Sequence, residues 1–213
     1  MADWSYGNAI ERFPVEIGQL IPMTDGSFLM AHDILDGLPA FMKRADLVFT
    51  DGPWNQGNMH SFYTKAAQTF AATYASFQEA LFSAIADVRP RICFLEIGKE
   101  FLGEYMLAMK RLYRYVTVYN STYYHKKDHI CYIVQGAEKR MNLHLDGIDE
   151  EDAISAIAAQ CEYETMGDFC MGRGLVALAA GRNHRKFVGT ELNPKRLAVT
   201  LERLHRLGIE VQL

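Results

Sequence analysis

Residues 167–174 read Gly-Asp-Phe-Cys-Met-Gly-Arg-Gly and are followed directly by the apolar pattern Leu-Val-Ala-Leu-Ala-Ala at 175–180. Two glycines separated by one residue before a helix allow the chain to turn sharply and to approach a ligand closely. The stretch therefore indicates a strand, turn and helix unit of an α/β fold. By itself the pattern is equally compatible with a tight turn that holds no ligand.

An acid follows these glycines at the distance expected for the next strand of such a unit. Residues 187–194 read Phe-Val-Gly-Thr-Glu-Leu-Asn-Pro, an apolar strand that ends at Glu191. In nucleotide-binding α/β folds an acid at this place bonds ribose hydroxyls, although an acid that only favours a helix amino terminus has the same pattern. A nicotinamide-dependent oxidoreductase is the competing assignment. Its fingerprint requires a third glycine, which residues 175–177 do not supply.

A third stretch favours methyl transfer over hydride transfer. Residues 46–55 read Asp-Leu-Val-Phe-Thr-Asp-Gly-Pro-Trp-Asn, an apolar strand that ends in an acid, a small residue, a proline and an aromatic ring. A base turned out of its stack needs a ring to lie on and an acceptor for its amino hydrogens. Trp54 would supply the ring, and Asp51 with a backbone carbonyl would accept from the amino nitrogen. Methyl transfer to that nitrogen then depends mainly on alignment.

Together these stretches resemble the amino-methyltransferases of DNA, which make N6-methyladenine or N4-methylcytosine. That family carries a D/N/S-P-P-Y/F/W turn and a D-P-F-x-G-x-G loop. The turn at 51–54 precedes the loop at 168–174 here, as in the permuted order called beta. Relatives that act on adenine in RNA carry DPPW, so Trp54 favours adenine N6. Cytosine N4 and an RNA substrate stay open.

The resemblance implies S-adenosylmethionine as the cofactor and DNA as the partner, and it carries roles over to particular positions. The catalytic turn would be Asp51, Gly52, Pro53 and Trp54. The cofactor would be held by Asp168, Phe169, Met171, Gly172 and Gly174 of the loop, by Glu191 and Asn193 after the next strand, and by Asp33 and Ile34 next to the cofactor's adenine. Members of the permuted group often pair, so the resemblance also implies a homodimer.

Three departures from the family pattern keep a second class of function open. Gly52 stands where the family has its first proline, Phe169-Cys170 replaces Pro-Phe, and Arg173 replaces Ser. Glycine lacks the fixed dihedral of proline and so loosens the turn. A non-catalytic methyltransferase-like subunit that supports an active partner would also tolerate these changes.

Apolar runs at 27–30, 47–50, 92–97, 116–120, 130–134 and 186–189 predict strands, and helical patterns occupy 63–88, 99–114, 150–160, 175–182 and 194–207. The alternation predicts an α/β fold with a Rossmann-like, mostly parallel methyltransferase sheet and helices on both faces. The two runs within 115–135 are joined by too few residues for a helix. They predict an antiparallel hairpin at one edge of the sheet.

The composition fits a single domain over residues 1–213, without a large target-recognition insertion. The 213 residues are 49% hydrophobic, with a net charge of −4, four scattered cysteines and no run long enough to cross a membrane. We expect a cytoplasmic protein. Because the histidines and cysteines lack ligand spacing, we expect no metal site.

Contacts to nucleic acid would come from short loops, because residues 55–167 are mostly needed to complete the sheet. We therefore expect relaxed sequence specificity. The candidate contacts combine cations for phosphates with tyrosines for stacking: Asn55, Tyr123, Tyr124, Lys126, Lys127, Lys139 and Arg140.

Overall fold

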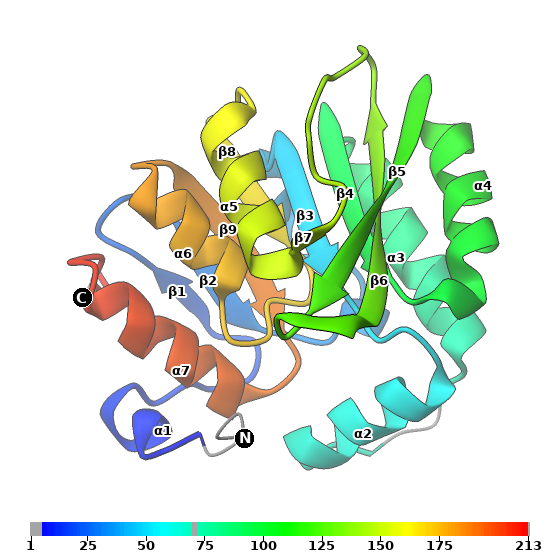
Figure 1. Cartoon of the computed structure of the whole chain (residues 1–213). Coiled ribbons are helices and arrows are strands. Elements are labelled where there is room, and N and C mark those ends of the chain that lie inside the picture. The colour runs from blue at the N-terminus through cyan, green and yellow to red at the C-terminus, as the bar shows by residue number, and fades with distance from the viewer. Residues whose placement is uncertain (1–5, 70–71, 213) are drawn as a thin grey trace.

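The computed structural model describes residues 6–69 and 72–212, whose strands form one nine-stranded sheet in the order β1-β2-β9-β8-β3-β4-β6-β5-β7 (Figure 1). The strands are β1 (Leu20–Pro22), β2 (Phe28–Ala31), β3 (Leu47–Asp51), β4 (Ile92–Ile97), β5 (Tyr115–Tyr123), β6 (Lys126–Ala137), β7 (Ile148–Asp149), β8 (Thr165–Asp168) and β9 (Lys186–Glu191). The helices are α1 (Ala9–Arg12), α2 (Gln56–Ala66), α3 (Tyr74–Val88), α4 (Leu102–Leu112), α5 (Glu150–Gln160), α6 (Leu175–Arg182) and α7 (Pro194–His205).

The predicted α/β class and mostly parallel sheet are confirmed. β2, β9, β8, β3 and β4 run parallel to one another, and β1 is antiparallel to β2. β6 pairs antiparallel with both β4 and β5, which is the predicted hairpin near one edge. The two-residue β7 adds to the outer side of β5. The carboxyl ends of the five parallel strands therefore share one edge of the sheet, where open α/β sheets bind their ligands.

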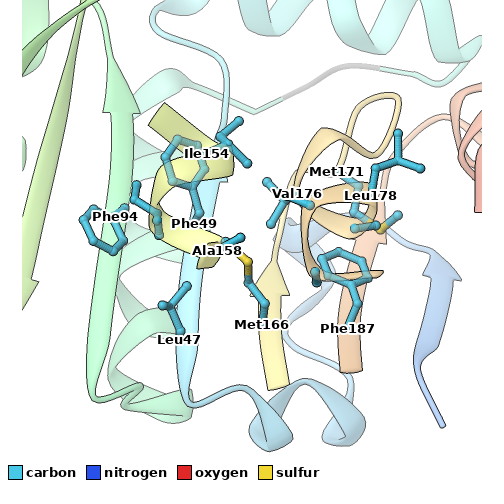
Figure 2. Close-up of a cluster of buried hydrophobic side chains, with 14 of the residues drawn as sticks. Leu47, Phe49, Phe94, Ile154, Ala158, Met166, Met171, Val176, Leu178 and Phe187 are labelled. Atoms are coloured by element: carbon cyan, nitrogen blue, oxygen red, sulfur yellow. The ribbon is translucent and has the colours of Figure 1, made fainter. Parts of the chain in front are cut away.

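Helices cover both faces of the sheet and bury two apolar clusters. One cluster joins the strands to α5, α6 and α7, and its members include Phe49 and Phe94 of the strands, Ile154 of α5, Val176 of α6 and Phe187 of β9 (Figure 2). The other cluster joins the opposite face to α2, α3 and α4, through Met59, Phe77 and Tyr105. In Figure 1, α5 and α6 cross the near face of the sheet and α3 lies behind it.

The helix predicted over 63–88 is wrong in its extent, because two separate helices occupy this part of the chain. Asn55 caps α2 by accepting from the backbone N–H of Asn58, and the helix ends at Ala67, whose φ of 55° is left-handed. Thr73 caps α3 by accepting from Ser76 N–H. Two amino-terminal caps within one stretch start two helices, since each satisfies the free N–H groups of a separate first turn.

The strand β8, which precedes the glycine loop, was not among the predicted strands. Its sequence, Thr-Met-Gly-Asp, holds one large apolar side chain and so gives no apolar run. Pairing with β3 on one side and β9 on the other places it in the middle of the sheet. Gly167 is needed there because a Cβ would lie 2.6 Å from the Cβ of Ala45.

In the two described ranges, no helix combines the length and apolar character that a bilayer span requires.

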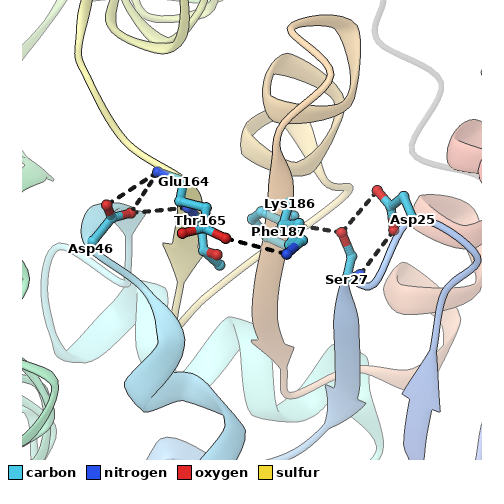
Figure 3. A network of polar contacts seen from close by, with 7 residues as sticks. All are labelled: Asp25, Ser27, Asp46, Glu164, Thr165, Lys186 and Phe187. Atoms are coloured by element: carbon cyan, nitrogen blue, oxygen red, sulfur yellow. Dashed lines mark hydrogen bonds and ion pairs between the residues drawn. The ribbon is translucent and has the colours of Figure 1, made fainter.

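A network of polar contacts centred on Asp46 joins the amino ends of the parallel strands (Figure 3). The carboxylate of Asp46 accepts from the backbone N–H groups of Glu164 and Thr165, at 3.1 and 2.9 Å, and pairs with Arg91 at 3.1 Å. On the neighbouring strands, Ser27 Oγ accepts from Phe187 N–H at 2.8 Å. These bonds hold the starts of β2, β9, β8 and β3 in register.

Asp46→Ala is expected to lower the free energy of unfolding by roughly 1.5–3 kcal/mol, because it leaves two backbone N–H groups without their charged acceptor. Urea unfolding measures the change. Arg91→Met is the matched control: it leaves both backbone bonds of Asp46 and removes the ion pair, together with an exposed hydrogen bond from Arg91 to the carbonyl of Glu162. The arginine is 62% exposed, and such ion pairs contribute about 0–1 kcal/mol. Equal losses in the two variants would show that the backbone bonds contribute nothing beyond the ion pair.

Candidate active site

A cavity of about 230 Å³ lies at the carboxyl ends of the parallel strands. It is walled by the residues after β2, the end of β3, the loop between β8 and α6, the end of β9, and the tip of the β5–β6 hairpin. Of the predicted cofactor residues, those that line it are Asp33, Ile34, Asp168, Phe169, Met171, Gly172 and Glu191, and of the predicted catalytic turn, Asp51 and Pro53. The tertiary structure thus brings the early turn and the late glycine loop to one cavity.

The glycine loop is closed on β9 by backbone and side-chain hydrogen bonds. Glu191 accepts from Gly172 N–H at 2.7 Å through one oxygen and from Asn193 N–H at 2.9 Å through the other. Thr190 Oγ1 donates to the carbonyl of Phe169 at 2.9 Å. Glu191 is therefore already engaged in shaping the loop, and a ligand hydroxyl would use its remaining lone pairs.

Gly172 and Gly174 both have left-handed backbones, with φ of 56° and 77°. Around Gly172 a Cβ would meet no atom within 4 Å, so the backbone there faces open space beside the cavity. Around Gly174 a Cβ would lie 2.4 Å from Thr200 Cγ2 of α7. The first glycine thus leaves room for a ligand, and the second allows α6 to pack against α7.

Asp168, at the end of β8, is buried and accepts two hydrogen bonds. Thr50 Oγ1 donates to it at 2.7 Å and Cys170 N–H at 2.9 Å. Burial raises the pKa of Asp168 to about 8, despite these two donors. A cationic group of a ligand would favour the ionised carboxylate at this place.

The other predicted cofactor residues differ in how they are placed. Asp33 lies at the wall of the cavity, where one oxygen accepts from Leu35 N–H and the other accepts from Tyr63 Oη at 2.6 Å. Asn193 does not line the cavity. Its side chain caps α7 by accepting from Lys195 N–H and donates to the carbonyl of Lys65. Its contact with a cofactor stays a prediction, and its structural role is to start α7.

In the turn after β3, the indole of Trp54 bonds the carboxylate instead of lining the cavity. Trp54 Nε1 donates to Asp51 Oδ1 at 2.9 Å, and the ring packs edge-on against Tyr123 at 5.5 Å. Burial raises the pKa of Asp51 to about 7, and the bond from Trp54 partly offsets this shift. The aromatic side chains that line the cavity near Asp51 include Phe77, Tyr123 and Tyr124. The ring available for stacking on a base in the cavity is therefore that of Tyr123, against which Trp54 packs edge-on.

Gly52 has a structural reason in this chain. A Cβ on Gly52 would lie 2.6 Å from Phe77 Cζ of α3. A proline at position 52 would place ring atoms in the space that Phe77 occupies. The glycine is thus matched to a bulky neighbour, which the turn sequence does not reveal.

Two carboxyl groups that sequence reasoning did not assign to the site lie beside Asp51. Glu96 is the register partner of Asp51 on the adjacent strand β4, and Glu150 begins α5. One carboxylate oxygen from each of Asp51, Glu96 and Glu150 lies within 4.8 Å of the others. Glu96 lies within β4 at 2% exposure. The sequence feature that could have pointed to Glu96 as a site residue is its position as the single acid in the apolar run at 92–97.

Glu150 is placed by its neighbour Asp149, which ties α5 to the hairpin. Asp149 caps α5 and also accepts from His125 N–H at 2.6 Å and from Thr122 Oγ1 at 3.3 Å. This anchor holds the hairpin tip over the cavity. It explains why Tyr123 and Tyr124 line the same cavity as Glu150.

The structure separates the predicted nucleic-acid contacts into two groups. Tyr123, Tyr124, Lys126 and Lys127 lie at the hairpin tip, and Asn55 follows the turn at 51–54. Lys139 and Arg140 come after the other end of β6, roughly 36 Å away for a twelve-residue strand, next to the start of β4. The cations at 126 and 127 thus lie at the hairpin tip, close in the chain to the tyrosines that line the cavity, whereas those at 139 and 140 are at the opposite end of the sheet.

The buried acids predict an unusual dependence of stability on pH. Burial raises the pKa of Asp51 to about 7 and that of Glu150 and Asp168 to about 8, and it raises the pKa of Glu96 well above its ordinary value. Because the folded chain then binds more protons than the unfolded one, stability falls as the pH rises from about 4 to about 8. We expect Glu96→Gln to raise the free energy of unfolding at pH 8 by on the order of 1 kcal/mol or more, and to change it little near pH 4.

Urea unfolding of the two proteins at both pH values measures this effect. Glu79→Gln, at an exposed position of α3, serves as the control and should follow the wild type at each pH. A gain for Glu96→Gln of the same size at both pH values would contradict a contribution from the ionised carboxylate.

Comparison with known proteins shows which solved structures share this fold. No protein-family model and no curated protein sequence matches the chain. Among solved structures, one similar protein is TTHA0409 of Thermus thermophilus, which is provisionally named a DNA modification methylase and was solved with S-adenosyl-L-methionine. It aligns at 16% sequence identity and a TM-score of 0.58, over 84% of this chain and 93% of its own. M1.HpyAVI aligns at 12% identity and 0.56, over 83% and 97%. PvuII DNA methyltransferase, described as cytosine-N4-specific, aligns at 12% and 0.56, over 88% and 90%.

Proposed function

The fold is that of structures of DNA amino-methyltransferases, and from this premise we propose that the protein transfers a methyl group from S-adenosylmethionine to an exocyclic amino group of a base in DNA, with adenine N6 favoured. One observation carries the proposal: Asp51 of the turn and Asp168 and Gly172 of the glycine loop line the same cavity. If the turn at 51–54 only reversed the chain, or if the loop at 168–174 held no ligand, the turn and the loop would not need to line the same cavity.

The residues present fit this cofactor. It carries positively charged sulfonium and ammonium groups, and the cavity wall includes the carboxyl groups of Asp33, Asp51, Asp168 and Glu191. Open backbone at Gly172 and the buried Asp168 would hold its amino-acid part, while Asp33, Ile34 and Glu191 would contact its nucleoside. When bound, the cofactor supplies an electrophilic methyl group.

The protein's own part in the reaction is positioning and hydrogen bonding. Asp51, oriented by the indole N–H of Trp54, would accept from the target amino group and hold its nitrogen in line with the methyl group. Tyr123 would stack on the base, and the lysines at 126 and 127 would contact phosphates. In this proposal residues 1–213 act as one methyltransferase domain whose short loops give relaxed specificity, alone or as a homodimer.

Cytosine N4 is the second candidate for the methylated atom, because a cytosine-N4-specific enzyme is among the similar structures. Both amino groups can bond to the same acceptor.

Calorimetry with S-adenosylmethionine, followed by transfer of a tritiated methyl group to DNA and RNA and mass spectrometry of the nucleosides, tests the proposal. We expect heat of binding and N6-methyladenine in DNA. N4-methylcytosine would select the second candidate, and absence of binding would favour a non-catalytic subunit. Methylation confined to one short palindrome would contradict relaxed specificity.

A further inference from the structure

We propose that Glu96 and Glu150 form the part of the site that reads the edge of the target base, and that together with Asp51 they select a base that presents an amino group beside an unprotonated ring nitrogen. This inference rests on the proposed function, since it assigns the specificity of the same cavity. It names a hydrogen-bonding pattern that the Watson–Crick edges of adenine and cytosine share and that those of guanine and thymine lack, because each of these has a carbonyl oxygen beside a ring N–H.

The three carboxyl groups come from three elements that the fold holds together. Asp51 and Glu96 are paired positions on β3 and β4, so their side chains point to the same side of the sheet. Glu150, at the first turn of α5, reaches the same point from the helix that covers this face. All three line the cavity, with one oxygen of each within 4.8 Å of the others. The cluster therefore lies where a base bonded to Asp51 would place its edge.

Glu96 lacks the donors that a buried carboxyl group needs. It is 2% exposed, and apart from a proton shared with Glu150 no group in the described ranges donates a hydrogen bond to its oxygens. A buried polar group without partners is costly, so such groups are rare outside functional sites. Because Glu96 lines the cavity, a bound ligand is the natural source of the missing partner.

The groups that face Glu96 are mostly acidic. They are Asp51 from β3, Glu150 from α5 and Cys131 from β6, while Tyr123 from β5 and Arg196 from α7 lie beyond Asp51. Burial and the neighbouring carboxylates raise the pKa of Glu96 well above its ordinary value and that of Glu150 to about 8. Like charges this close cannot all ionise at neutral pH, so the pair Glu96 and Glu150 holds a proton.

A protonated carboxyl group beside a carboxylate offers one donor and one acceptor. The edge of adenine presents its N6 amino hydrogens and the acceptor N1, and that of cytosine its N4 amino hydrogens and the acceptor N3. The amino hydrogens would bond to Asp51, and the shared proton of Glu96 and Glu150 would bond to the ring nitrogen. Guanine and thymine carry a carbonyl oxygen in place of the amino group and a ring N–H in place of the ring acceptor. The carbonyl would face the carboxylate of Asp51, and the N–H would face the proton of the pair.

Base analogues that lack the ring acceptor test this contact. Trp54 bonds Asp51, and Trp4→Phe leaves it as the single tryptophan, so its fluorescence reports occupancy of the site. The probes are short oligodeoxyadenylates and oligodeoxycytidylates, the same oligonucleotides with 1-deazaadenine or 3-deazacytosine, and oligothymidylate. We expect the deaza analogue of the bound base, and oligothymidylate, to bind roughly tenfold to a hundredfold more weakly than that base.

Variants of Glu150 separate the proton from the side chain. We expect binding to the wild type to decline above about pH 8, as the pair loses its proton. Glutamine offers a donor and an acceptor at every pH, so Glu150→Gln should keep the preference and lose this decline. Glu150→Ala should bind the natural base and its deaza analogue equally. Asp152→Asn, an exposed position of α5, is the control and should match the wild type.

The outcomes for the two proposals are distinguishable. Methyl transfer without any effect of the deaza analogues or of Glu150→Ala would overturn this inference and leave the proposed function intact. Deaza-sensitive binding without methyl transfer would support the inference and overturn the proposed function. Elemental analysis and oligonucleotide binding in EDTA test whether the three carboxyl groups hold a metal instead. The inference would be overturned if the wild type contained a divalent ion that Glu96→Gln lacked, and if oligonucleotides did not bind once EDTA removed that ion.

Discussion

Asp51→Ala is expected to lower the rate of methyl transfer by about 10²–10³-fold while leaving the affinity for S-adenosylmethionine within about threefold of the wild type. The carboxylate lies at the end of β3, and one of its oxygens accepts from Trp54 Nε1 at 2.9 Å. In the proposed function this orientation makes Asp51 a fixed acceptor for the target amino group. Removing it leaves the cavity wall but no group that orients the nitrogen. Tritiated-methyl transfer and calorimetry on the same preparation measure the two quantities.

Asp51→Asn and Asp168→Ala are the matched comparisons. Asparagine keeps an oxygen acceptor, and the family turn itself accepts asparagine, so this variant should retain most of the rate. Asp168→Ala should instead weaken cofactor binding, because Asp168 lies on the glycine-loop side of the cavity with Thr50 and Cys170 as donors. Full turnover by Asp51→Ala, or equal loss of cofactor affinity in both alanine variants, would contradict the division of roles between turn and loop.

Gly174→Ala is expected to lower the free energy of unfolding by about 3 kcal/mol or more. A left-handed φ of 77° costs a residue with a Cβ roughly 1–2 kcal/mol, and the new Cβ would also lie 2.4 Å from Thr200 Cγ2. Since α6 and α7 would have to separate, we also expect weaker binding of S-adenosylmethionine. Urea unfolding and calorimetry measure the two effects.

Gly172→Ala separates backbone strain from collision. Gly172 has a similar φ of 56° but open space around its Cα, so its loss should be limited to the strain. Combining Gly174→Ala with Thr200→Ala removes two of the three close contacts and should recover part of the stability. Equal losses at 172 and 174, with no recovery in the double variant, would show that packing against α7 is not the cause.

Much of the fold could be predicted because it depends on local patterns. The strands at 47–51, 92–97 and 186–191 are short apolar runs, and the hairpin at 115–137 has too short a connection for a helix. β8 could not be predicted from the sequence, because four residues with one large side chain carry no periodicity. Its strand conformation comes from pairing with β3 and β9 on its two sides. The single helix expected over 63–88 failed for a local reason, since the caps at Asn55 and Thr73 start separate helices.

By itself, the sequence determined which chemical groups the site can contain: an acid and an indole in a turn, two glycines before a helix, and an acid after the next strand. Only the tertiary structure decided which groups meet. Parallel pairing of β3 and β4 brings Asp51 beside Glu96, and the Asp149 anchor brings Glu150 and the hairpin tyrosines to them. It also turns Trp54 back onto Asp51 and fills the space at Gly52 with Phe77. Local propensity depends on neighbours in the chain, whereas hydrogen bonding, burial and the pKa of a carboxyl group depend on neighbours in space, which come from segments far apart in sequence.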